Sequence, residues 1–121
     1  MVTETKTRLV EPNITVFEIL GRLSLGNSLQ SVETTLSKLI DDGARKLVID
    51  VAGLTHIDSA GVGMLVACNG RMEQQGGRVR VAGAQGSVEK TFEIVHLGRI
   101  LPLDPDVVSA CRNLSADGTA V

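Results

Sequence analysis

The chain has 121 residues, of which 43% are hydrophobic and 21% charged, and its formal net charge is −2 at pH 7. This length and apolar content are those of one folded domain with a single core. With only two aromatic residues, Phe17 and Phe92, and no excess of basic charge, the chain lacks stacking rings and a cationic surface, so we do not expect it to bind nucleic acid.

Two strands are expected at the start of the chain, over residues 5–10 (TKTRLV) and 14–20 (ITVFEIL). Residues 11–13 (EPN) lie between them and form a turn-like break, so these two strands should pair as a hairpin. Gly21 is expected to end the second strand.

A helix is expected from about residue 26 to residue 42, because apolar residues recur there at the spacing of one helix face. Asn27 or Ser28 could cap its start, and Gly43 stands where a left-handed C-terminal residue would fall. The apolar positions are Leu29, Val32, Leu36, Leu39 and Ile40.

The centre of the chain predicts a strand, a helix and a second strand. Residues 46–53 (KLVIDVAG) are almost continuously apolar, which indicates a strand buried on both faces. A helix should follow from about residue 60 to residue 75 and end at Gly76-Gly77. Residues 78–84 (RVRVAGA) alternate as a strand does, with Val79 and Val81 on one face.

The last third of the chain predicts a helix, a short strand at residues 100–101 and a final helix, with a frayed tail over residues 115–121. The third helix is marked by Val88, Phe92 and Val95, and the final one by Val107, Cys111 and Leu114. This alternation of strands and helices indicates a single α/β domain over residues 1–121, with a core at about 5–114. We expect a mixed sheet of four to five strands and about four helices.

Metal sites and disulfides are not expected. Cys68 and Cys111 lie far apart in apolar helical patterns, as buried reduced thiols do. His56 and His96 have no cysteine or second histidine at ligand spacing. We therefore expect no metal and no cofactor.

The expected location is the cytoplasm. Residues 1–12 are polar and of mixed charge, unlike a signal peptide. No segment approaches the roughly 20 apolar residues of a membrane helix, so membrane insertion is not expected.

Residues 54–66 (LTHIDSAGVGMLV) place an acid and a serine, Asp58 and Ser59, where a strand ends and a helix begins. Sites in open α/β sheets gather at such junctions. A nucleophile elbow, G-x-S-x-G, would need a glycine where Ile57 stands, and its base would be His96. The bulky Ile57 disfavours this hydrolase, and we do not expect an enzyme.

Two other sites can be considered at strand ends. Asp50 could be the phosphate-accepting aspartate of a receiver domain, but the acids that would hold magnesium are missing after residues 14–20, so a strand-end or turn residue is the better interpretation. Residues 83–86 (GAQG) lack the G-K-[ST] of a nucleotide loop and indicate a tight turn.

Ser59 itself has two compatible interpretations. A serine at a helix N-terminus lies near unpaired N–H groups and the positive end of the helix dipole, where a phosphate is tolerated. Ala60, Gly61 and Gly63 add little bulk near the hydroxyl, which would give a partner access. Asp58 and Ser59 are also favoured N-caps. From the residues alone, helix cap and phosphate acceptor both remain open.

Residues 46–65 (KLVIDVAGLTHIDSAGVGML) resemble the central motif of STAS domains, in particular the bacterial anti-sigma factor antagonists. In that motif an apolar strand and short loop lead to Asp-Ser, a small residue, Gly and an aliphatic helix. The similarity extends to residues 21–23 (GRL), 76–77 (GG) and 100–104 (ILPLD), and it covers about residues 5–114.

The resemblance implies a phosphorylation switch that regulates sigma-factor-dependent transcription. The unphosphorylated protein would bind an anti-sigma factor, which is also a serine kinase and would phosphorylate Ser59 from ATP. A serine phosphatase would reset it. The implied partner-binding residues lie around the motif and in the loop before the first long helix: Asp58, Ser59, Ala60, Gly61, Val62, Gly63, Ser24 and Asn27.

One departure from the family pattern concerns that loop. An acid often follows the Gly-x-Leu segment in the family, and here Ser24 stands in its place. The resemblance also allows an alternative, a STAS adaptor that is not phosphorylated, as in stress-signalling scaffolds or lipid-transport ABC systems. We favour a free-standing antagonist because the sequence contains no transporter segment.

Overall fold

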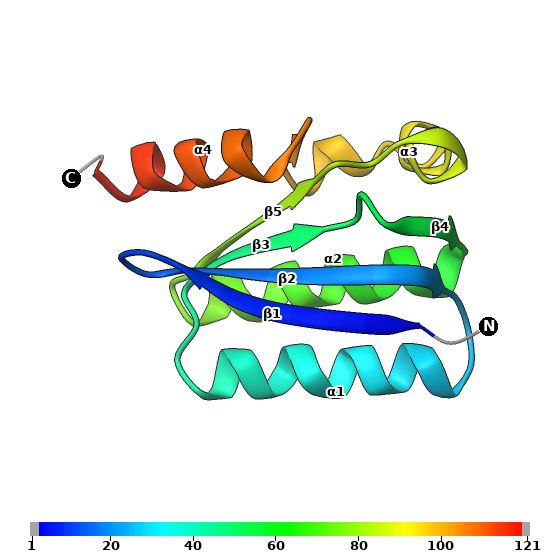
Figure 1. The fold of residues 1–121 in the computed structure, drawn as a ribbon, viewed down its shortest axis with the longest axis horizontal. Helices are drawn as coiled ribbons and strands as arrows, with labels where there is room; N and C mark the ends of the chain where they lie inside the picture. Colours follow the sequence, from blue (N-terminus) through cyan, green and yellow to red (C-terminus); the bar gives the residue numbers. More distant parts are fainter. Residues whose placement is uncertain (1–2, 120–121) are drawn as a thin grey trace.

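The computed structural model describes residues 3–119 and contains a mixed sheet with helices on both faces (Figure 1). Along the chain the elements are β1 (Glu4–Val10), β2 (Ile14–Leu23), α1 (Asn27–Asp41), β3 (Lys46–Asp50), β4 (Leu54–Ile57), α2 (Ser59–Gln74), β5 (Arg78–Ala82), α3 (Gly86–Ile94), a 3-10 turn η1 (Leu97–Arg99), β6 (Leu103–Asp104) and α4 (Val107–Thr119).

The sheet has the strand order β1-β2-β3-β5-β6, and β4 pairs with the far end of β2. The expected hairpin is confirmed, since β1 runs antiparallel to β2, with Val10 opposite Ile14 beside the turn. The remaining neighbours are parallel. The expected α/β class and mixed sheet are therefore confirmed, with six strands where four to five were predicted.

The two faces of the sheet are covered by different helices. Phe17 and Ile19 of β2 pack with buried side chains of α1, α2 and α3, whereas Ile14 and Val16 face the other way and pack with α4. Figure 1 shows α1 and α4 on opposite sides of the sheet. Because successive strand residues point to opposite faces, β3 contributes to both cores, and its expected burial on both faces is confirmed.

The region between β2 and α2 differs from the prediction. Gly21 does not end β2, which continues to Leu23, because a strand absent from the prediction, β4, pairs with that extension. Leu23 lies opposite Ile57. The segment Leu54–Ile57 is thus a strand between β3 and α2.

The position of β6 was also predicted wrongly. The last strand is Leu103–Asp104 and not residues 100–101. Leu101 is buried but lies in a bend after η1, and Ile100 is exposed. Val95 follows the end of α3 and is 43% exposed, so it does not belong to that helix's buried face.

The helix ends agree with the prediction in part. Gly43 has a φ of +109°, as expected for a residue just past a helix C-terminus. The residue that precedes α1 is Gly26, so neither Asn27 nor Ser28 occupies the N-cap position. α4 reaches Thr119 and includes most of the segment expected to fray. Residues 120–121 lie outside the described residues.

Candidate functional site

Asp58 and Ser59 lie at the edge of the sheet where its parallel strands end. Asp58 links the end of β4 to the start of α2, and the neighbouring strand β2 ends beside it and leads into the loop of residues 24–26. In Figure 1 this edge is on the right, where β2 turns toward α1. The extension of β2 and its pairing with β4 place the loop against the helix start.

Asp58 uses both carboxylate oxygens as hydrogen-bond acceptors. Its Oδ1 accepts the N–H of Gly61 at 2.9 Å and thereby caps α2. Its Oδ2 accepts the N–H of Leu25 at 3.0 Å, across to the loop that precedes α1. The Asp58 N–H donates to the carbonyl oxygen of Leu23 at 3.3 Å. Asp58 therefore connects the helix start to the β2–α1 loop.

These hydrogen bonds also keep Asp58 ionised. The N–H groups of Leu25 and then Gly61 lower the pKa of the Asp58 carboxyl, because they stabilise its charged form. Partial desolvation acts in the opposite direction but is the smaller effect. The site consequently carries a negative charge beside Ser59 at neutral pH.

Ser59 is the first residue of α2 and is exposed. The cap of this helix is Asp58, so the interpretation of Ser59 as the capping residue is wrong. Within residues 3–119 the Ser59 hydroxyl has no hydrogen-bond partner. Because this hydroxyl is exposed and does not cap the helix, another molecule can reach it without breaking a hydrogen bond.

The small residues after Ser59 have different surroundings. Gly61 is buried, and a Cβ at this position would lie 2.4 Å from the Leu23 carbonyl oxygen and 2.8 Å from Cγ1 of Ile57. Close packing against β2 therefore explains this glycine. Gly63 is exposed and a Cβ there would meet nothing within 4 Å, so it leaves the surface open.

The remaining predicted partner-binding residues surround the same helix start. Ala60 is half-buried, whereas Val62 is buried and packs in the core beneath this surface. Ser24 is half-buried in the β2–α1 loop, and Asn27 is the first residue of α1. Seven of the eight predicted residues lie on the two segments that Asp58 connects, and Asn27 directly follows the loop as the first residue of α1.

Leu25 belongs to this region and was missed in the sequence analysis. Its side chain is 81% exposed, although leucine is usually buried. The available signal was an apolar residue in a loop, between Ser24 and Gly26, outside the helical spacing that begins at Leu29. Periodicity reveals residues that face a core, and a leucine that faces solvent gives no periodic signal.

The two alternative sites considered in the sequence lie in connections that follow β3 and β5. Asp50 is the last residue of β3 and its Oδ1 accepts the N–H of Ala52 at 3.0 Å, which confirms its interpretation as a strand-end or turn residue. The residues after β5 were expected to form a tight turn; they form a short irregular connection to α3, in which Gly83 has a φ of +84°. A Cβ on Gly83 would lie 3.0 Å from the Ala52 Cβ. Both its positive φ and this close approach therefore favour glycine.

The two cysteines are not joined by a disulfide. Cys68 is buried and Cys111 half-buried, and both are free thiols. Burial raises the pKa of the Cys68 thiol to about 11. Across residues 3–119, three or more potential metal ligands nowhere come together. In the same part of the chain, no helix has the length and apolar character needed to cross a membrane.

Solved structures with the same fold include regulators and a transporter domain. An anti-sigma factor antagonist from Mycobacterium paratuberculosis is 19% identical, covers 93% of this chain and 94% of its own, and superposes with a TM-score of 0.81. SpoIIAA from Bacillus in its phosphorylated form is 21% identical, with coverages of 91% and 98% and a TM-score of 0.70. A sulfate transporter family protein from Wolinella succinogenes is 14% identical, with coverages of 90% and 90% and a TM-score of 0.72.

These structures share the fold with this chain at low sequence identity. The sequence pattern of the STAS domain family matches residues 6–110, which include every strand but the start of β1, and the Asp58-Ser59 junction. This match spans most of the chain. The chain therefore belongs to the STAS domain family.

Proposed function

We propose that this protein is an anti-sigma factor antagonist whose binding to an anti-sigma factor is switched off by phosphorylation of Ser59. The observation that carries this proposal is the exposed Ser59 hydroxyl at the first position of α2, beside a cap that Asp58 already provides. A kinase can reach that hydroxyl without removing a hydrogen bond of the fold. The solved SpoIIAA structure in a phosphorylated form supports phosphorylation as a property of this fold.

The electrostatics of the helix start tolerate a phosphate on Ser59 in the free protein and oppose it in a covered interface. The first backbone N–H groups of a helix and its dipole stabilise an anion at this position. Phosphorylation adds roughly 1.5 to 2 negative charges at neutral pH, next to the ionised Asp58 carboxylate. In the centre of a protein interface such a charge is costly unless a cation meets it. The phosphorylated protein therefore dissociates from its partner.

In the proposed mechanism, partner proteins add the phosphate to Ser59 and remove it. The anti-sigma factor acts as the serine kinase and supplies ATP, and a serine phosphatase restores the hydroxyl. The cellular compartment is then the cytoplasm, where sigma factors work. A hydrolase would need a base at Ser59, and the candidate, His96, lines a separate cavity with Phe92 and Arg99.

Two substitutions at Ser59 test the switch. Ser59→Ala should retain binding to the purified anti-sigma factor kinase and lose phosphorylation, measured by intact mass after incubation with ATP. Ser59→Asp should bind more weakly, because it places a permanent charge in the interface. Phosphate found on another residue, or equal affinity of both variants, contradicts the proposal.

A second function follows from the family resemblance, and the match to a sulfate transporter family protein shows that this fold also occurs outside the antagonists. In this alternative the chain is an adaptor in a stress-signalling scaffold or a lipid-transport ABC system, and Ser59 is only a contact residue. Ser59→Asp would then co-purify with its partner as well as the wild type does. Recovery of an ABC-type ATPase as the stable partner would support the adaptor, and recovery of a serine kinase would support the switch.

A further inference from the structure

Leu25 is the most exposed of the large hydrophobic side chains in residues 3–119, at 81%. It lies in the three-residue loop between β2 and α1, beside the Asp58-Ser59 junction. An exposed leucine gains nothing from the core of its own domain. Its contribution to free energy is realised only when another surface covers it.

The loop that carries Leu25 is held in place from both sides. The Leu25 N–H donates to Asp58 Oδ2 at 3.0 Å, and the carbonyl oxygen of Leu23 accepts the Asp58 N–H at 3.3 Å. Leu23 is fully buried and packs against Gly61. Gly26 follows with a φ of +140°, which directs the chain into α1. The backbone of Leu25 is thus fixed while its side chain faces solvent.

We propose that Asp58 is a positioning residue that fixes the β2–α1 loop against the start of α2, and that this loop presents Leu25 as an apolar anchor for a hydrophobic pocket on the protein that binds at Ser59. This inference rests on the proposed function and adds to it the chemistry of the partner surface. The partner must carry an apolar pocket beside the site that receives the Ser59 hydroxyl.

Three observations favour a protein partner with such a pocket over other occupants. The anchor is continuous with the Ser59 surface, because the Asp58 carboxylate touches both segments. A side chain whose backbone is already ordered loses little conformational entropy on binding, so most of its burial contributes to affinity. Asp58 next to the anchor is satisfied by two N–H groups and tolerates a covered interface.

The anchor also explains how a phosphate on the adjacent segment would act. The apolar pocket removes water from the surface around Leu25. A phosphoserine at position 59 would have to give up its hydration at the same place. The neighbouring Asp58 is itself an anion and cannot neutralise the phosphate. Release on phosphorylation therefore requires no change in the fold of this protein.

Truncation of the anchor, compared with a matched control, tests the first half of the proposal. Leu25→Ala should weaken binding of the purified anti-sigma factor kinase about 10- to 100-fold, the loss typical of a central interface residue. It should raise the KM of phosphorylation and leave kcat unchanged.

Leu9→Ala is the matched control, because it makes the same chemical change at a 59% exposed leucine on β1. Leu9 lies opposite Thr15, far along β2 from the site. Its affinity should stay within about twofold of wild type. Equal effects of the two variants would overturn the anchor.

Asp58→Asn tests the second half without any partner. Asp58 binds the Leu25 and Gly61 N–H groups with different oxygens, and in the amide one of these oxygens is replaced by an NH2 donor, so one of the two hydrogen bonds is lost. Hydrogen exchange of the Leu25 amide, followed by NMR, should accelerate at least about tenfold more than that of the β3 amides, whose exchange reports the stability of the whole domain. Unchanged exchange at Leu25 would overturn the positioning role.

The two measurements also separate this inference from the proposed function. If the wild type neither binds nor is phosphorylated by the kinase, the proposed function and the anchor both fail, and the exchange of Leu25 still decides the role of Asp58. If the wild type is bound and phosphorylated but Leu25→Ala behaves like Leu9→Ala, only the anchor fails.

Discussion

Asp58 is the residue on which the local structure of the site depends most. An Asp, and not a Ser or Thr, is needed here because two oxygens on one carbon can reach two N–H groups in different segments, Gly61 in α2 and Leu25 in the loop. A serine could accept from only one of them with good geometry. The position of Ser59 outside the cap follows, since the capping function is already filled.

Replacement of Asp58 should lower stability in a pH-dependent way. Asp58→Ala should cost about 1 to 2 kcal/mol of unfolding free energy at pH 7, through loss of the helix cap. The folded pKa of Asp58 lies below its unfolded value of 3.8. Its charge-dependent contribution is therefore complete above pH 3.8 and disappears as the pH falls through the lower folded pKa.

Urea unfolding of the wild type and Asp58→Asn at several pH values measures this. The amide retains one acceptor and does not titrate, so the stability difference between the two proteins should shrink as the pH falls below 3.8. A difference that stays constant down to the lowest pH at which both proteins fold would contradict the assignment.

Gly61 and Gly63 provide a matched pair of substitutions on one helix. Gly61→Ala should destabilise by about 1 to 3 kcal/mol, because the new Cβ would overlap the Leu23 backbone. Gly63→Ala should be neutral or stabilise by up to about 1 kcal/mol, because alanine favours the helix and space is open there. Thermal or urea unfolding distinguishes them, and a stabilising Gly61→Ala would show that Leu23 does not constrain α2.

At the scale of elements, the errors of the sequence analysis occur where pairing, and not local sequence, defines a strand. The four residues of β4 include the exposed Thr55 and His56, and they do not alternate between buried and exposed positions. They become a strand because β2 extends beside them, across Gly21. The strand at 103–104 is likewise defined by its pairing with β5. The periodic helix α1 and the almost continuously apolar strand β3 could be predicted because their own residues carry the signal.

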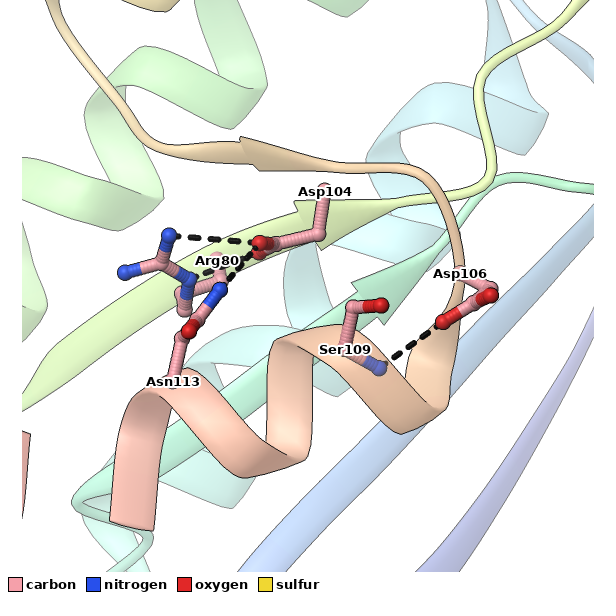
Figure 2. A network of polar contacts seen from close by, with 5 residues as sticks. All are labelled: Arg80, Asp104, Asp106, Ser109 and Asn113. Atoms are coloured by element: carbon pink, nitrogen blue, oxygen red, sulfur yellow. Dashed lines mark hydrogen bonds and ion pairs between the residues drawn. The ribbon is translucent and has the colours of Figure 1, made fainter. Parts of the chain in front are cut away.

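The short strand β6 is held by a polar network that connects it to β5 and α4 (Figure 2). Asp104 accepts from Arg80 at 2.6 Å and 3.2 Å, through the guanidinium Nε and a terminal nitrogen. It also accepts from Asn113 of α4 at 2.7 Å. Nearby, the Ser109 N–H donates to Asp106 at 2.8 Å and lowers the pKa of Asp106 at the start of α4.

Loss of Asp104 should therefore be costly. The Asp104 side chain is 3% exposed and that of Arg80 17% exposed, so removing the acid leaves a half-buried guanidinium without its main counter-charge. Asp104→Ala should lower the unfolding free energy by about 3 to 5 kcal/mol. The exposed pair Lys38–Asp42 is the control, since both side chains are more than half exposed, and Asp42→Ala should cost less than about 1 kcal/mol. Similar losses for the two variants would contradict a special role for the network.

At the scale of the whole molecule, the alternation of strands and helices and the position of the motif were accessible from sequence. Right-handed crossovers and a run of parallel strands place Ser59 at the carboxyl edge of the sheet, and the structure has it there. The contact of this edge with the β2–α1 loop was not accessible, because Leu25 and Asp58 are 33 residues apart and meet only through folding. The same holds for the packing of Gly61 on Leu23.

A final prediction concerns whether the proposed switch changes the fold. Ser59→Asp should leave stability within about 0.5 kcal/mol of wild type, because two effects of similar size oppose each other: attraction to the helix N-terminus and repulsion from Asp58. Far-UV circular dichroism and urea unfolding would measure this, with Ser59→Ala as the uncharged control. The same Ser59→Asp protein should bind the anti-sigma factor kinase more weakly. Weak binding together with unchanged stability places the effect at the surface, because the domain remains folded while its interface carries an added charge. A loss of several kcal/mol would instead mean that release follows from unfolding of the α2 start, and the surface mechanism would be wrong.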